Sequence, residues 1–175
     1  MIGLSGRING QYCGVNGKQR LSAGGVPEEL KSRLQGAPRL PVVVHVVWHR
    51  EEENVSDLQI QAQIDALNAD FRNRNFQTPP VPEEFRELMA DAGLEFCLAA
   101  RDPQGNPTDG ITRTYTPEPG IGDTRALDGR RKIFFNELGG KDAWPVDRYI
   151  NIYVCDFSFL GIATAAADTS LLNTP

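Results

Sequence analysis

Two histidines and three cysteines are the residues of this sequence best suited to metal binding or nucleophilic chemistry. His45 and His49 lie four positions apart in the valine-rich run 40–49. On a strand they would point to the same face about 13 Å apart, whereas a zinc–nitrogen bond is about 2 Å long. One ion therefore cannot be bound by both. The pattern predicts a hydrogen-bonded core histidine at position 45 and a strand-end histidine at position 49.

The cysteines, Cys13, Cys97 and Cys155, are too widely spaced for a ribbon-type or finger-type zinc site. An odd number allows one disulfide with one thiol left over. The cysteine count therefore does not decide between an oxidising and a reducing compartment. Cys97 and Cys155 could form a disulfide, or each could be buried as a small apolar residue. Cys13 lies in a glycine-rich stretch, where a thiolate could approach a metal. It could equally be an ordinary free cysteine or half of a disulfide.

Other chemistries find little support in the residues. No Ser/His/Asp or Cys/His triad can be argued from the spacing, and no glycine-rich phosphate loop with its lysine occurs. The formal net charge of −5 gives no reason to expect nucleic acid or an anionic membrane as partner. No apolar run is long enough to predict a membrane span.

The element that must position these residues is the run 40–49. Its density of valines predicts a strand buried on both faces, because a helix would restrict every valine side chain. Ser56 and Gln59 then form a capping-box pattern. An apolar stripe follows them, so we expect a helix over 56–73 that packs on the sheet. The stripe comprises Ile60, Ile64, Leu67 and Phe71.

The rest of the chain predicts further strands around this core. We expect a second helix from Pro82 to Met89 with its apolar residues inward, a turn-rich segment over 102–110, and strands over 94–101, 111–116 and 149–155. Together these elements predict an α/β fold, a twisted mixed β-sheet with packed helices. Residues 1–39 are rich in glycine and read as a leader, and residues 40–175 as one domain.

Five blocks of the sequence, in order, resemble the opening of the catalytic domain of pappalysin-family metallopeptidases, which belong to the metzincin clan. The resemblance implies an incomplete metzincin-like N-terminal subdomain preceded by a propeptide-like leader. It also implies a secreted zinc metalloendopeptidase, made as a zymogen, that acts on peptides or proteins. No signal peptide is visible at the start of the sequence. The blocks are residues 40–47, 55–71, 95–99, 102–113 and 139–155.

Two sites follow from this resemblance. Cys13-Gly14 resembles the cysteine-glycine element of the family's propeptides, whose thiolate can occupy the zinc and keep the enzyme latent, although Val15 replaces the usual threonine. Gly161, Ile162 and Ala163 resemble the start of the segment that leads to the substrate-binding strand at the cleft edge.

The sequence departs from the family in one respect. The zinc-binding string H-E-x-x-H-x-x-G-x-x-H does not occur among these 175 residues. We therefore expect an N-terminal fragment that binds no zinc and is inactive alone. The alternative is a non-catalytic binding module or a degenerate peptidase remnant.

Overall fold

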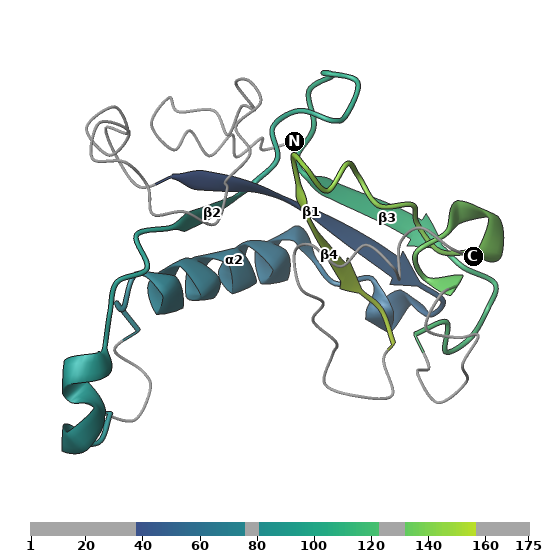
Figure 1. Ribbon diagram of the computed structural model, residues 1–175. Coiled ribbons are helices and arrows are strands. Elements are labelled where there is room, and N and C mark those ends of the chain that lie inside the picture. Colours follow the sequence, from purple (N-terminus) through teal and green to yellow (C-terminus); the bar gives the residue numbers. More distant parts are fainter. Residues whose placement is uncertain (1–37, 76–80, 123–131, 157–175) are drawn as a thin grey trace, which may run out of the picture.

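The valine-rich run forms the centre of the fold, as expected. It is strand β1 (Arg39–Trp48), and every side chain from Val42 to Val47 is buried, so burial on both faces is confirmed. The structure is a computed structural model, shown in Figure 1, which describes residues 38–75, 81–122 and 132–156.

Three strands pair with β1, all of them parallel to it. β2 (Glu95–Leu98) lies along the N-terminal part of β1, β3 (Ile111–Tyr115) along its C-terminal part, and β4 (Ile150–Val154) along its middle. This arrangement confirms the α/β class. The antiparallel strand of a mixed sheet does not occur among the described residues.

Helix α2 (Asp57–Phe71) covers one face of the sheet (Figure 1). Its capping box forms as predicted, because the Gln59 amide donates to Ser56 Oγ at 3.3 Å and the Ser56 amide donates to Gln59 Oε1 at 2.9 Å. Ile60 and Ile64 are buried against alternate valines of β1. Each buried isoleucine stabilises the packing by about 2 kcal/mol.

Irregular segments cover the opposite face. Val43 packs with Ala99 and Tyr149, and Val47 packs with Ile121 and Ile133. Loops therefore bury this face of the sheet, which explains why β1 is apolar on both sides.

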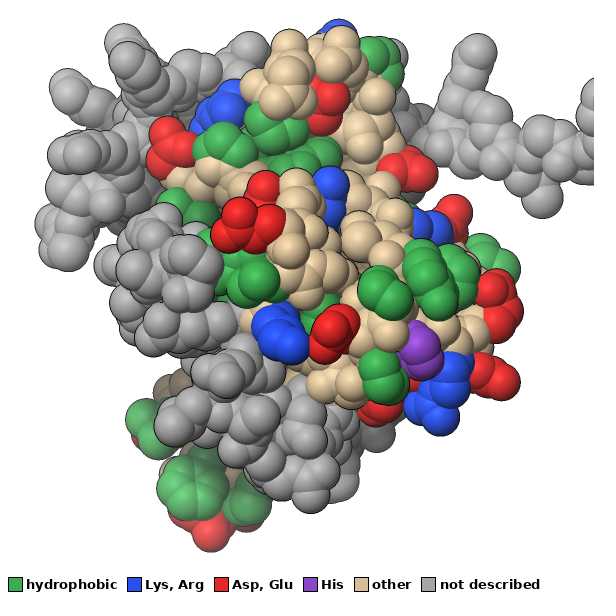
Figure 2. All heavy atoms as spheres, turned by 90° about the vertical axis from the view of Figure 1, so that its right-hand side faces the viewer, with side chains coloured by type: hydrophobic (Ala, Val, Ile, Leu, Met, Phe, Trp, Pro, Cys, Tyr) green, Lys and Arg blue, Asp and Glu red, His purple; other side chains and the backbone are tan. Residues whose placement is uncertain are grey.

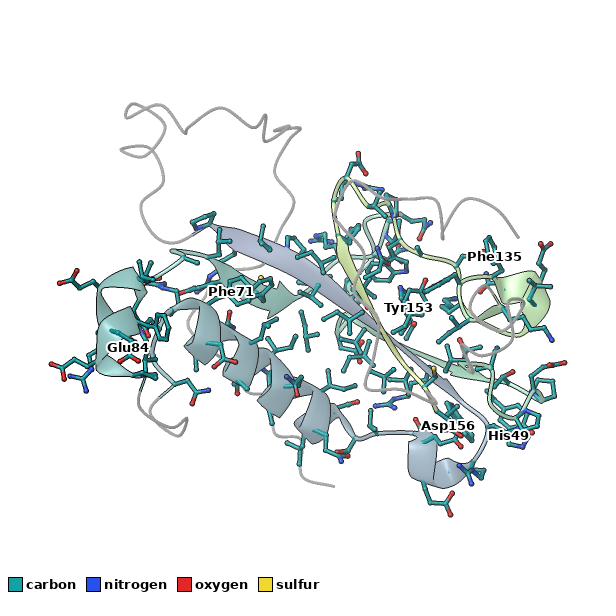
Figure 3. All side chains as sticks on the ribbon, turned by 60° about the horizontal axis from the view of Figure 1, so that its bottom comes forward. His49, Phe71, Glu84, Phe135, Tyr153 and Asp156 are labelled. Atoms are coloured by element: carbon teal, nitrogen blue, oxygen red, sulfur yellow. The ribbon has the colours of Figure 1, made fainter. Side chains whose placement is uncertain are left out.

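The predicted helix from Pro82 to Met89 is wrong in type and in burial. The segment forms a 3-10 helix, Glu83–Leu88, and its apolar side chains face solvent: Phe85 is 53% exposed, Leu88 77% and Met89 43%. It projects beyond the C-terminal end of α2 in Figure 1, and Glu84 marks it in Figure 3. A 3-10 helix of six residues is too short to form an apolar stripe that could pack on the sheet.

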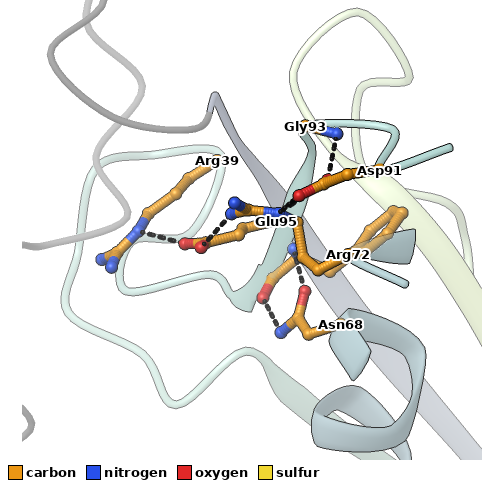
Figure 4. A network of polar contacts seen from close by, with 7 residues as sticks. Arg39, Asn68, Arg72, Asp91, Gly93 and Glu95 are labelled. Atoms are coloured by element: carbon orange, nitrogen blue, oxygen red, sulfur yellow. Dashed lines mark hydrogen bonds and ion pairs between the residues drawn. The ribbon is translucent and has the colours of Figure 1, made fainter. Parts of the chain in front are cut away.

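A side chain of α2 protects the outer edge of β2 (Figure 4). Asn68 Oδ1 accepts from the Phe96 amide at 2.6 Å, and its Nδ2 donates to the Phe96 carbonyl at 2.8 Å. Beside it, Arg72 bridges Asp91 and Glu95, with N–O distances of 2.8 Å to each. Asn68 thus offers Phe96 the same donor and acceptor that a neighbouring strand would offer. It thereby blocks the outer edge of β2, which could otherwise pair with another strand.

We expect Asn68→Ala to lower the free energy of unfolding by about 2 kcal/mol, because both polar groups of Phe96 lose their partners. Urea unfolding measures this effect. Gln61→Ala is the control on the same helix, since Gln61 bonds only the exposed Asp65 at 2.9 Å, and it should cost a few tenths of a kcal/mol. Equal effects of the two variants would show that Asn68 does not hold the β2 edge.

Candidate functional site

His45 joins three strands at the centre of the sheet. It is fully buried on β1, its Nδ1 lies 2.7 Å from Thr112 Oγ1 on β3, and its Nε2 lies 2.9 Å from Asn151 Oδ1 on β4. Both ring nitrogens are therefore engaged, and none is left for a metal ion. The predicted hydrogen-bonded core histidine is confirmed.

Asn151 sets the tautomer of this histidine. Its Oδ1 accepts from the Trp144 amide at 2.7 Å, and its Nδ2 donates to the Trp144 carbonyl at 3.0 Å. Because this amide orientation presents an oxygen to His45, the imidazole carries its proton on Nε2 and accepts at Nδ1 from the Thr112 hydroxyl. Neutral His45 thus has a partner for each nitrogen.

Burial also favours the neutral imidazole. It lowers the pKa of His45 from 6.5 to about 4, the Asn151 hydrogen bond raises the pKa in part, and the positive charge of Lys141 lowers it further. The ring of Tyr153 lies 4.8 Å from that of His45, and burial raises the pKa of Tyr153 well above its usual value. The surroundings of His45 therefore suit a structural role.

His49 follows directly after the end of β1, as predicted, and is labelled in Figure 3. Figure 2 shows a histidine side chain, in purple, on the surface of the molecule. Its amide donates to Glu53 Oε2 at 2.8 Å, and its Nδ1 donates to the Thr116 carbonyl at 3.0 Å. The His49 amide is also the main reason why the pKa of Glu53 is lowered. This histidine therefore helps to close the turn after β1.

Of the two alternatives for Cys97 and Cys155, the disulfide between them does not form. Cys155 is a free thiol, whereas Cys97 is disulfide-bonded. Cys97 pairs with Pro41 on β1, and Cys155 follows the residue that pairs with Val46. Six residues along a strand separate these positions by about 20 Å, far beyond the Cα distance of about 7 Å that a disulfide can bridge.

The residues that the resemblance assigned to function lie elsewhere in the chain. Cys13 and the segment of Gly161, Ile162 and Ala163 are outside the described residues. The last described strand before that segment in the sequence is β4, which pairs with β1. No other strand among residues 38–75, 81–122 and 132–156 pairs with β4.

The described residues contain no group of three or more His, Cys, Asp or Glu side chains that could hold a metal ion. The whole sequence has two histidines, and one of them is committed to Thr112 and Asn151. A four-coordinate zinc site of the family type therefore does not fit the residues of this part of the chain. None of its helices is long and apolar enough to cross a membrane.

Sequence reasoning did not find the partners of His45 or the edge contact of Asn68. One signal was present: Asn151 interrupts an apolar strand at a position that turns toward the core. A polar residue there needs a buried partner, and His45 lies two residues further along the same face of β1 as Val43, the residue that pairs with Asn151. Thr112 and Asn68 carry no comparable signal, because both residue types are common at exposed positions.

No protein-family model matches the chain, and no curated protein matches it. Solved structures do. Mirolysin in complex with a compound is 42% identical, with a TM-score of 0.67, over 74% of this chain and 47% of its own.

Mature mirolysin of Tannerella forsythia, in complex with a cleaved peptide, is 41% identical with a TM-score of 0.64, over 72% of this chain and 45% of its own. A promirolysin variant of the same organism is 42% identical with a TM-score of 0.61, over 68% of this chain and 37% of its own. The chain therefore spans less than half the length of each of these metallopeptidases. The described part of the chain has the fold of a metzincin-like N-terminal subdomain, and it shares this fold with mirolysin.

Proposed function

We propose that this chain is the N-terminal part of a secreted, zinc-dependent metalloendopeptidase of the pappalysin family. The observation that carries the proposal is the likeness to mirolysin, at 42% identity and a TM-score of 0.67 over 74% of the chain. Identity at this level over a shared fold supports a common origin more strongly than fold alone.

Within this proposal, residues 1–39 are a propeptide-like leader and residues 40–175 begin the catalytic domain. Cys13 is the latency thiolate, and Gly161, Ile162 and Ala163 lead to the strand that binds the substrate peptide. The mirolysin complex with a cleaved peptide supports a peptide substrate. Among the described residues β4 pairs with β1 alone, which agrees with a substrate-binding strand beside it.

The residues of this chain act as a scaffold. Zinc, when bound in the complete enzyme, activates a water for attack on a peptide bond. The described residues do not contain a set of ligands that could hold this ion, so we assign no catalytic step to these residues. Their contribution is a rigid sheet in which His45 fixes β3 and β4 to β1.

We expect the purified 175-residue chain to contain no stoichiometric zinc and to cleave no peptide. A longer product of the same reading frame, extended through an H-E-x-x-H-x-x-G-x-x-H helix, should contain about one zinc per chain and cleave peptides. Elemental analysis and a fluorogenic peptide library measure the two properties. Replacing the glutamate of that helix by glutamine is the control, since it should retain zinc and lose cleavage.

Two results would contradict the proposal. A reading frame that stops after Pro175 without such a helix would favour a binding module or a peptidase remnant. A longer product that binds zinc but cleaves no peptide would exclude the endopeptidase activity while leaving the fold assignment unchanged.

A further inference from the structure

β2 and β3 lie one after the other along the same edge of β1. The Ala99 amide donates to the Val42 carbonyl at 2.8 Å, and the Val44 amide donates to the Gly110 carbonyl at 2.8 Å. Because alternate residues of a strand direct their backbone polar groups to the same edge, Val42 and Val44 serve one edge of β1. β4 pairs with this same stretch of β1 and therefore takes the opposite edge. Together β2 and β3 form one outer edge of the described sheet.

The outward side of β3 carries backbone groups that are open to pairing. Its inward side faces β1, since the Gly110 carbonyl accepts from the Val44 amide and the Thr116 amide donates to the Trp48 carbonyl at 2.8 Å. The odd-numbered residues of β3 therefore point away from β1. Within the part of the chain that the structure describes, four of their groups have no hydrogen-bond partner: the Arg113 amide, the Arg113 carbonyl, the Ile111 carbonyl and the Tyr115 amide.

The chain guards the two halves of this edge differently. On β2, Asn68 occupies the amide and the carbonyl of Phe96. On β3 the edge carries the charged Arg113, and charges on edge strands commonly deter pairing. The Arg113 guanidinium, however, turns to the start of α2, where it forms an ion pair with Asp57 and donates to the Val55 carbonyl at 2.8 Å. Its charge is compensated within the chain, so the backbone edge of β3 stays open.

We propose that β3 is a homodimer interface, at which the β3 strands of two copies of this chain pair antiparallel about a two-fold axis at Arg113. In this register the two Arg113 residues exchange amide-to-carbonyl hydrogen bonds. The Tyr115 amide of each copy donates to the Ile111 carbonyl of the other. All four open groups of each strand then have partners, and the two sheets become one continuous sheet.

The side chains along β3 match in the same register. Ile111 of one copy lies opposite Tyr115 of the other, and aromatic residues pair favourably with β-branched residues across antiparallel strands. Tyr115 is 57% exposed, so it is available for this contact. The two Arg113 side chains lie opposite each other, where like charges repel, and the Asp57 carboxylate of each copy reduces this repulsion. The strand is therefore complementary to a second copy of itself.

Symmetry favours a closed dimer over an open-ended array. β3 of one copy could also pair with β4 of the next, but this contact joins two different surfaces and leaves one of each unpaired, so further copies would keep adding. Pairing of β3 with β3 uses the same surface twice and closes with two copies. It does not involve β4, which the proposed function places beside a substrate-binding strand. The dimer therefore does not depend on the proposed function.

Sedimentation equilibrium of the complete 175-residue chain tests the dimer. The weight-average mass should rise from 19.3 kDa toward twice that value between about 1 µM and 1 mM protein, the range expected for a small interface. Arg113→Pro should raise the dissociation constant at least about tenfold, because proline lacks the amide that crosses the interface. This amide faces away from β1, so the pairing of β3 with β1 is kept. Arg113→Ala is the matched control, since it keeps the amide and should dimerise as the wild type does.

Cysteine cross-linking gives a second readout that does not require the proline variant to fold. In the proposed register residue 113 faces its own counterpart at a Cα distance of about 5.5 Å, which a disulfide can bridge. Arg113→Cys, made together with Cys155→Ser, should therefore form covalent dimers when oxidised glutathione is the oxidant. Asp65→Cys in the same background is the control, because Asp65 lies exposed on α2, and it should stay largely monomeric.

Four results would overturn the inference. One is a mass that stays at 19.3 kDa up to about 1 mM protein. Another is equal dimerisation of Arg113→Pro and Arg113→Ala. Assemblies larger than a dimer would show that β3 pairs with a different edge, and equal cross-linking of Arg113→Cys and Asp65→Cys would show unspecific contact. None of these results bears on zinc content or peptide cleavage, which test the proposed function separately.

Discussion

Acidification from about pH 7 to pH 4 should lower the free energy of unfolding by about 3 kcal/mol through His45 alone. The pKa of His45 is about 4 in the folded chain, below its ordinary value of 6.5. The folded state therefore binds fewer protons than the unfolded state between these two values. The contribution is fully present above pH 6.5 and is lost as the pH falls toward 4.

The geometry explains why a proton is costly at this site. A second ring proton would meet the Thr112 hydroxyl, which donates to Nδ1, and would place a positive charge in a fully buried position. The charged group that acts on His45 is Lys141, which opposes protonation. The lowered pKa values of Glu53, Asp91 and Asp102 also destabilise the fold in acid, but they act below about pH 4.5.

Urea unfolding between pH 4 and 7.5 measures the effect. In His45→Gln the steep rise of stability between about pH 4 and 6.5 should disappear, because no imidazole remains at this position. His49→Gln is the control, since it removes the strand-end histidine and should keep the wild-type profile. Parallel profiles for wild type and His45→Gln would show that His45 does not carry the pH dependence.

Local signals in the sequence predicted the elements that form this site. The valine run predicted β1, and the Ser56–Gln59 capping box with its apolar stripe predicted α2. These predictions succeeded because strand and helix formation in this chain agrees with burial in the tertiary structure. The spacing argument also excluded joint metal binding by His45 and His49.

The sequence did not predict how segments that are distant in the chain lie against one another. Nothing in the sequence gives the register of β2 against β1, so the separation of Cys97 from Cys155 could not be known. The exposure of Phe85 and Leu88 has the same origin, because apolar spacing cannot show whether a surface lies within reach to receive it. The site residues Cys13 and Gly161 stay untested, since both lie outside the described residues.

Gly140→Ala should destabilise the fold by more than about 4 kcal/mol, the range reserved for severe packing defects. Gly140 is buried, and a Cβ added to it would lie 2.2 Å from the Ile133 carbonyl oxygen and 2.3 Å from that of Lys132. Both contacts are with backbone atoms, so no side-chain rotation relieves them. The Ile133 oxygen also accepts from the Lys141 amide at 2.8 Å, so its displacement would break this turn.

The damage should spread to the face of the sheet that loops cover, because Ile133 packs with Val47 and Ile121. Gly105→Ala is the matched control: nothing lies within 4 Å of its added Cβ, and only the positive φ of 91° opposes the substitution. It should cost about 1–2 kcal/mol, the penalty of a left-handed backbone for alanine. Urea midpoints compare the two variants, and the yield of soluble protein ranks them if Gly140→Ala does not fold. Equal midpoints and equal yields would mean that the 132–141 turn tolerates a side chain at Gly140 and does not anchor this face.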